Sequence, residues 1–185
     1  MISLNFKKYK LHLFISAVYF ILYVLNNNFF SILTYKEHIH FIYLPAGMRF
    51  FFAAIYREDA WVGIFLGSFF AMVFLFENTS ILSITFYATL SATVPILTIY
   101  AFDSFHPLGN QLENLNLKLI VSLAFVYAVT YSFFYALYGY YILGTTLSNF
   151  YRDWIATFVG DLTGSMIFLT ILASQRHLIL KFLRI

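Results

Sequence analysis

Residues 44–49, LPAGMR, open an apolar segment that continues to about Tyr56. The segment places the charge of Arg49 among residues that are otherwise compatible with lipid. A guanidinium does not readily lose its proton, and its burial in a bilayer costs about 2.5–3.5 kcal/mol unless a partner or water receives it. The stretch therefore predicts a membrane-embedded arginine that needs a partner elsewhere in the chain.

The composition of the whole chain is that of a membrane protein. Of its 185 residues, 62% are hydrophobic and 10% are charged, whereas soluble domains carry about 25% charged residues. Uncharged runs at residues 11–35, 78–102 and 119–151 are each long enough to cross a hydrocarbon core of about 30 Å. We expect one all-α, polytopic transmembrane helical bundle that occupies residues 1–185, in contact with the lipid bilayer.

The placement of charge and the lack of cysteine exclude several classes of site. The net charge is +3, but the basic residues are spread over short loops and tails, so they do not indicate nucleic-acid binding. The absence of cysteine excludes disulfides, thiolate metal sites and a cysteine nucleophile.

The apolar segments predict about six membrane spans, at residues 11–26, 41–56, 61–76, 81–102, 118–139 and 154–173. With six spans, both termini lie on one side of the membrane. Cytoplasmic loops carry an excess of Lys and Arg, so the side with more of them is the cytoplasm. The basic residues then divide into eight inside (Lys7, Lys8, Lys10, Arg57, Lys118, Arg176, Lys181, Arg184) and two outside (Lys36, Arg152).

The other charge deep in an apolar span is Asp161, within FVGDLTG at residues 158–164. Arg49 lies eight residues past Phe41, and Asp161 lies seven past Trp154. If both helices start at the outer face, these depths are about 12 and 10.5 Å, which predicts an ion pair in the outer half of the membrane. Two interpretations stay open: the pair neutralises two buried charges and locks two helices together, or it binds a ligand.

In the second interpretation, Arg49 and Asp161 line an outward-facing pocket for a small polar or anionic ligand. Pro45 and Gly47 would loosen the start of the helix there. Side-chain hydroxyl groups would add hydrogen bonds, and the candidates are Tyr43, Thr157 and Thr163.

Pairs of small residues four positions apart occur in three of the spans. Such pairs let helix backbones approach closely. We expect them to serve packing within the chain, with a homodimer face as the alternative. The pairs are Gly63 and Gly67, Ala88 and Ala92, and Gly160 and Gly164.

The sequence offers little support for a metal, a cofactor or catalysis. Glu37, His38 and His40 could supply metal ligands, because the alternate residues His38 and His40 would share one face of an extended segment, but no third strong ligand lies nearby, so we expect no metal site. The many Phe and Tyr residues are interpreted as lipid-facing and packing residues. There is no phosphate-cradling glycine loop and no G-x-S-x-G motif, so we expect no cofactor and no enzymatic activity.

Two passages resemble a known family. YLPAGMR at residues 43–49, followed by AWVGIFLG at residues 60–67, resembles the early motif of bacterial membrane-associated sensor (MASE-type) domains. The stretch from Trp154 through GDLTG at residues 160–164 is similar to their final-helix motif, although the proline that often follows that motif is absent here.

The resemblance implies a sensory module for signal transduction in the bacterial cell inner membrane. Such domains commonly have about eight spans and precede a histidine kinase or diguanylate cyclase module. About six spans and a short basic tail lead us to expect a shortened, stand-alone module that signals through a partner protein or as a homo-oligomer.

Other functions compete with this interpretation. Six spans with cytoplasmic ends are also similar to the substrate-binding or accessory subunits of energy-coupling-factor importers. A structural subunit of a larger membrane complex is a third alternative.

Overall fold

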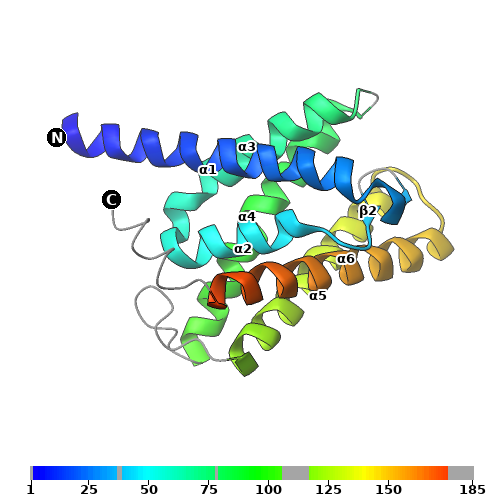
Figure 1. Cartoon of the computed structure of the whole chain (residues 1–185). Helices are drawn as coiled ribbons and strands as arrows, with labels where there is room; N and C mark the ends of the chain where they lie inside the picture. Colours follow the sequence, from blue (N-terminus) through cyan, green and yellow to red (C-terminus); the bar gives the residue numbers. More distant parts are fainter. Residues whose placement is uncertain (1, 37–38, 78, 106–116, 175–185) are drawn as a thin grey trace.

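The computed structural model describes residues 2–36, 39–77, 79–105 and 117–174, which form a bundle of six α-helices (Figure 1). A small two-stranded hairpin and two short 3-10 helices connect some of them. The elements are α1 (Ile2–Phe29), η1 (Ser31–Leu33), β1 (Thr34–Lys36), β2 (Ile39–His40), α2 (Leu44–Tyr56), η2 (Arg57–Ala60), α3 (Trp61–Leu75), α4 (Ile81–Phe105), α5 (Leu117–Tyr141) and α6 (Leu147–Ser174).

Successive helices alternate in direction. The hydroxyl groups of Ser83 and Ser91 on α4 contact those of Tyr138 and Tyr131 on α5, at 3.1 and 3.3 Å. The residue numbers rise along α4 as they fall along α5, so these helices are antiparallel. Contacts between the other neighbours place α1, α3 and α5 in one direction and α2, α4 and α6 in the other. The chain therefore begins α1 and ends α6 at the same end of the bundle.

Helix α2 lies at the centre of the bundle, between α1 and α6, and also contacts α4 (Figure 1). Nine of its thirteen residues are buried. Pro45 occupies the first turn, where a missing backbone N–H costs no helical hydrogen bond. The arrangement surrounds Arg49 with protein on every side.

Four segments of the described residues are long and apolar enough to cross a membrane: 8–29, 44–75, 81–105 and 118–141. The second of these contains both α2 and α3, because only the short helix η2 separates them. The all-helical, multi-pass membrane architecture predicted from the sequence is therefore confirmed. The count of six crossings and the orientation of the termini stay predictions.

Charged residues form ion pairs at both ends of the bundle. Two pairs lie where α1 begins, and the third joins the β1–β2 hairpin to α6. These pairs are Lys8–Asp59 (2.8 Å), Arg57–Asp103 (3.1 Å) and Lys36–Asp153.

Helices α1, α2 and α6 begin several residues away from the starts of the predicted spans, and α1 begins at Ile2 rather than at residue 11. Helix α2 starts at Leu44 rather than Phe41, because residues 41–43 bend out of helical geometry and make backbone bonds elsewhere. The N–H of Phe41 donates to the carbonyl of Leu33 (2.9 Å), and that of Tyr43 donates to Gly160 (3.1 Å). Helix α6 starts at Leu147, seven residues before the predicted Trp154. The Thr146 hydroxyl accepts a hydrogen bond from the backbone of Asn149 (3.3 Å), as an N-cap does.

Asn26 of α1 connects α1 to the start of α2. Its side chain is 2% exposed; its Oδ1 accepts from the N–H of Leu44 (2.9 Å), and its Nδ2 donates to the carbonyl of Ile42 (3.3 Å). We expect Asn26→Ala to lower the free energy of unfolding by about 1–3 kcal/mol, because it removes the side-chain partner of two partly buried backbone groups. The exposed Asn28→Ala is the matched control. Equal stability of the two variants in chemical unfolding would contradict this role.

Candidate functional site

Arg49 and Asp161 form an ion pair in the interior of the bundle. Nη2 of Arg49 lies 3.1 Å from Oδ1 of Asp161, and the two residues are 0% and 1% exposed. Nη1 of Arg49 donates a second hydrogen bond to Oγ of Ser91 on α4, at 2.8 Å. The pair therefore joins α2 to α6 directly, and to α4 through the serine.

The pairing predicted from the sequence forms, although the depths used to predict it were wrong. Arg49 is five residues into α2, whereas Asp161 is fourteen residues into α6. The two meet because α2 begins halfway along α6: the backbone of Tyr43 binds that of Gly160. The two helices begin at different positions along the bundle, but Arg49 and Asp161 still lie side by side.

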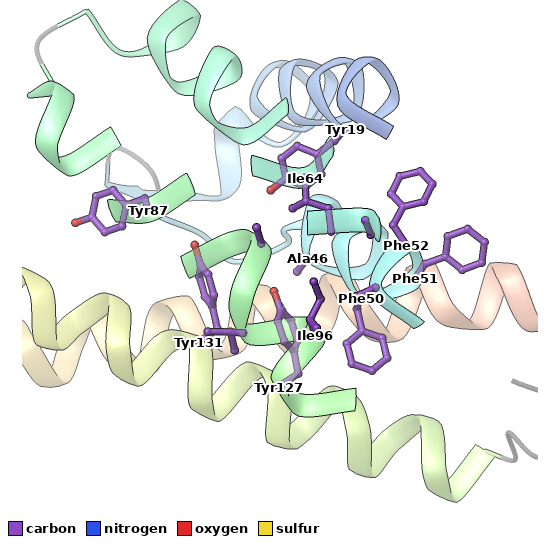
Figure 2. Close-up of a cluster of buried hydrophobic side chains, with 14 of the residues drawn as sticks. Tyr19, Ala46, Phe50, Phe51, Phe52, Ile64, Tyr87, Ile96, Tyr127 and Tyr131 are labelled. Carbon is purple, nitrogen blue, oxygen red and sulfur yellow. The ribbon is translucent and has the colours of Figure 1, made fainter. Parts of the chain in front are cut away.

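Tyrosine rings surround the guanidinium of Arg49. Its Cζ lies 3.8 Å from the centre of the Tyr131 ring, 5.3 Å from that of Tyr43 and 5.5 Å from that of Tyr127. Figure 2 shows Tyr127 and Tyr131 side by side on one face of α5. Cation–π contacts of this kind contribute about 2 kcal/mol when desolvated, so the rings compensate part of the cost of burying the charge.

The interpretation of the tyrosines as lipid-facing or general packing residues was incomplete. Tyr127, Tyr131 and Tyr135 on α5 are all buried, and Tyr127 and Tyr131 lie against the charge. A signal was present in the sequence, because residues four apart lie on the same face of a helix. A face of hydroxyl-bearing rings in a membrane helix points to a polar partner in the interior.

Glycines allow the residues before α2 to lie against α6. A Cβ added at Gly160 would lie 1.9 Å from the carbonyl oxygen of His40, and one at Gly164 would lie 1.9 Å from that of Tyr43. Real Cβ contacts are not this short. The packing within the chain that was expected for Gly160 and Gly164 is what the structure shows, although part of their partner is extended backbone rather than a helix.

The other small-residue pairs also lie inside the bundle. Gly63 and Gly67 of α3 pack against α1, where added Cβ atoms would lie 2.6 Å from Ile15 Cβ and 2.7 Å from the Ser16 carbonyl oxygen. Ala88 and Ala92 of α4 are both fully buried. All three pairs are thus used within the chain.

A small cavity with a mixed polar and apolar wall lies beside the ion pair. The space open to the centre of a water-sized sphere is about 20 Å³, enough for one or two water molecules. Polar lining residues include His40, Ser91, Thr157 and Asp161. Among the described residues, Nε2 of His40, Oγ1 of Thr157 and Oδ2 of Asp161 are buried without a hydrogen-bond partner.

The structure brings together some of the predicted ligand-binding residues and separates others. Asp161 and Thr157 line the cavity, whereas Arg49 lies behind the Asp161 carboxylate. The hydroxyl of Thr163 lies 2.7 Å from the Phe41 carbonyl and 2.7 Å from the Val159 carbonyl of its own helix, so its single proton is shared between α6 and the segment before α2.

Two further predicted residues belong to the first turn of α2. Pro45 is buried there. Gly47 packs against α6, where an added Cβ would lie 2.3 Å from Cβ of Phe168. The role of all six residues in ligand binding stays a prediction.

The imidazole of His40 is part of the site, although the sequence suggested it only as a possible metal ligand. Its proposed companions Glu37 and His38 lie outside the described residues. The His40 side chain is buried, its Nδ1 lies 2.9 Å from Oγ1 of Thr34, and its ring stacks on that of Tyr43. The imidazole therefore belongs to the wall of the cavity.

Burial lowers the pKa of the His40 imidazole below its ordinary value of 6.5. The stability that comes from neutral His40 is therefore complete above about pH 6.5, and is lost as the pH falls toward the folded-state pKa. We expect the melting temperature of the wild type to fall more steeply between about pH 7 and pH 5 than that of His40→Gln. Parallel pH profiles of the two proteins would contradict this expectation.

Comparison with known proteins agrees with the architecture. A family model, MASE1, matches residues 11–184, nearly the whole chain. No curated protein and no solved structure matches the chain. The family is one of membrane-associated sensor domains, as the motifs at residues 43–49, 60–67 and 154–164 indicated. The chain is a multi-pass helical membrane protein with these motifs and this match, and it belongs to the MASE1 family.

Proposed function

We propose that the chain is the input module of a sensor in the bacterial inner membrane, and that it responds to a small polar ligand beside Arg49 and Asp161. In this proposal all six helices cross the membrane and both termini are cytoplasmic. The alternating helix directions support six crossings. The predicted cytoplasmic residues Lys8 and Arg57 form ion pairs at one end of the bundle, and the predicted outer residue Lys36 forms one at the other.

The observation that carries the proposal is the cavity with its unpaired polar atoms. A buried polar atom without a hydrogen-bond partner costs about 1–3 kcal/mol. Three such atoms, on His40, Thr157 and Asp161, lie on residues that line one cavity. A small polar ligand in this space would complete the missing hydrogen bonds.

The position of the site suggests how binding is transmitted. Asp161 binds α2 through Arg49, and α6 also holds the segment before α2 through Gly160 and Thr163. A ligand that bonds to the free oxygen of Asp161 would change the balance of contacts between α2 and α6. The resulting shift of α6 would be passed on to a partner signalling protein or to a second copy of the chain.

A thermal-unfolding screen of the purified chain in nanodiscs tests this proposal. The solutes are small alcohols, amides, amines, carboxylates and inorganic anions. We expect one class to raise the melting temperature of the wild type by about 3–6 °C at a concentration ten times its Kd. Thr157→Val should abolish the shift, because it removes a hydroxyl from the cavity wall.

The matched control is Thr170→Val on the same helix. Thr170 is exposed, and its hydroxyl bonds only to the Met166 carbonyl four residues earlier. This variant should keep the shift. The proposal would be contradicted if a solute raised the melting temperatures of Thr157→Val and the wild type equally. It would also be contradicted if no class of solute raised the melting temperature of the wild type.

A further inference from the structure

We infer that the cavity selects a small, neutral hydrogen-bond donor, and not the anion that a buried arginine suggests. This inference rests on the proposed function, that the cavity is a ligand site. It concerns the chemical class of the ligand, which the family match does not specify.

Both Nη groups of Arg49 are occupied by residues that line the cavity, and only its Nε lacks a hydrogen-bond partner among the described residues. Nη1 donates to Ser91, Nη2 donates to Asp161, and the guanidinium lies over the ring of Tyr131. The cavity wall contains Asp161 but not Arg49 among the described residues. An anion in this space would therefore meet the carboxylate of Asp161 before the guanidinium.

The three unpaired atoms of the cavity wall can each accept a hydrogen bond. Oδ2 of Asp161 is a carboxylate oxygen without a partner among the described residues, and it accepts hydrogen bonds when ionised. The Thr34 hydroxyl lies within reach of the Phe30 carbonyl (3.5 Å) and of Nδ1 of His40 (2.9 Å). In the neutral tautomer whose Nδ1 donates to Thr34, Nε2 keeps a free lone pair.

The third atom is Oγ1 of Thr157, which can both donate and accept. A ligand with two or more N–H or O–H groups would therefore satisfy Asp161 and His40 together, and could exchange a bond of either polarity with Thr157. A wall that offers two acceptors and one hydroxyl favours ligands with amine, alcohol or amide groups over carboxylates and phosphates.

Charge favours a neutral ligand. Arg49 and Asp161 already neutralise each other at 3.1 Å. A cation would enter beside the guanidinium, and an anion beside the carboxylate. Burying an ion without a free partner costs several kcal/mol. Two of the five tyrosines that line the cavity, Tyr43 and Tyr131, already contact Arg49.

Size limits the ligand further. The space open to a water-sized sphere, about 20 Å³, accommodates one or two water molecules. A space of one or two waters limits the ligand to a solute of about three non-hydrogen atoms. A small primary amide or a short alcohol has this size.

Three probes of one shape and different charge test the inference: formamide (neutral donor), formate (anion) and formamidinium (cation). All carry one isolated C–H proton, so saturation-transfer NMR reports the same atom in each. The full-length protein in nanodiscs is compared with Thr157→Leu and Met72→Phe, which fill the cavity from α6 and α3. The exposed Thr170→Leu is the control.

We expect formamide to bind the wild type and Thr170→Leu, and to bind the filled variants about tenfold more weakly. Formate and formamidinium should give equal signals in all four proteins. Two filled variants keep the test valid if one of them does not fold.

A cavity-dependent signal from formate or formamidinium would overturn the inference and leave the proposed ligand site standing. A formamide signal that is the same in filled and unfilled proteins would also overturn it. In that case the broader thermal screen decides separately whether another class of solute uses the site.

Discussion

Removal of one partner of the Arg49–Asp161 pair is expected to lower the free energy of unfolding by about 3–5 kcal/mol. Both side chains are almost fully buried, so Arg49→Ala leaves a carboxylate, and Asp161→Ala leaves a guanidinium, without a partner in the interior. Arg49→Ala also loses the bond to Ser91 and the contact with Tyr131. It should therefore be the more damaging of the two changes, as measured by chemical unfolding in detergent.

The Arg57–Asp103 pair provides a control at the end of the bundle. Its two side chains are 26% and 36% exposed, and pairs of this kind contribute about 0–1 kcal/mol. Arg57→Ala should therefore cost much less than Arg49→Ala. If Arg57→Ala and Arg49→Ala lowered the free energy of unfolding equally, burial of the ion pair would not determine the size of the loss.

Exchange of the two charges should restore only part of the stability. Arg49→Asp with Asp161→Arg again brings opposite charges together, but the guanidinium then starts from α6. It cannot reproduce the position over Tyr131 that Arg49 has on α2. Full recovery in the exchanged protein would mean that the surrounding rings contribute nothing.

The second large effect is expected at the glycines of α6. Gly160→Ala and Gly164→Ala each place a methyl group 1.9 Å from a backbone oxygen, of His40 and Tyr43 respectively. A backbone atom cannot turn aside as a flexible side chain does. We expect each variant to lose about 3 kcal/mol or more, because the segment before α2 must leave α6 and break the Tyr43–Gly160 and Thr163–Phe41 hydrogen bonds.

Gly139 is the matched control for these glycines. It also lies inside a helix, α5, but an added Cβ would meet its nearest neighbour, Thr145, at an ordinary 3.6 Å. Gly139→Ala should leave stability unchanged or raise it by about 0.5–1 kcal/mol, since alanine favours the helix. If Gly160→Ala and Gly139→Ala unfolded at the same denaturant concentration, the close packing of the segment before α2 on α6 would be disproved.

The main features of the fold could be predicted because each leaves a strong local signal. Long uncharged runs predicted the membrane helices. Two lone charges in apolar surroundings predicted the ion pair, because neither could be buried alone. The glycines at 160 and 164 predicted close packing.

The remaining features depend on contacts between distant residues. Residues 41–43 are apolar, as a membrane helix would be, and only the backbone of Gly160, far along the chain, shows why they are not helical. Residue type alone does not distinguish the tyrosines that surround Arg49 from aromatic residues that face lipid. The cavity is lined by residues of α1, α3, α4, α5 and α6 and of the segment that contains β2. Four of these helices each contribute two residues that are four positions apart, but the sequence does not show that these helix faces meet.

The central claim is that the ion pair between α2 and α6 organises the membrane core and the site beside it. A double-mutant cycle on the purified protein tests this claim most directly, with Arg49→Met, Asp161→Leu and the double variant in chemical unfolding. The account predicts that each single change is strongly destabilising, that the apolar double variant recovers most of the loss, and that the coupling energy is about 3 kcal/mol. Losses that add to within about 0.5 kcal/mol would show that the two charges act independently and would contradict the account.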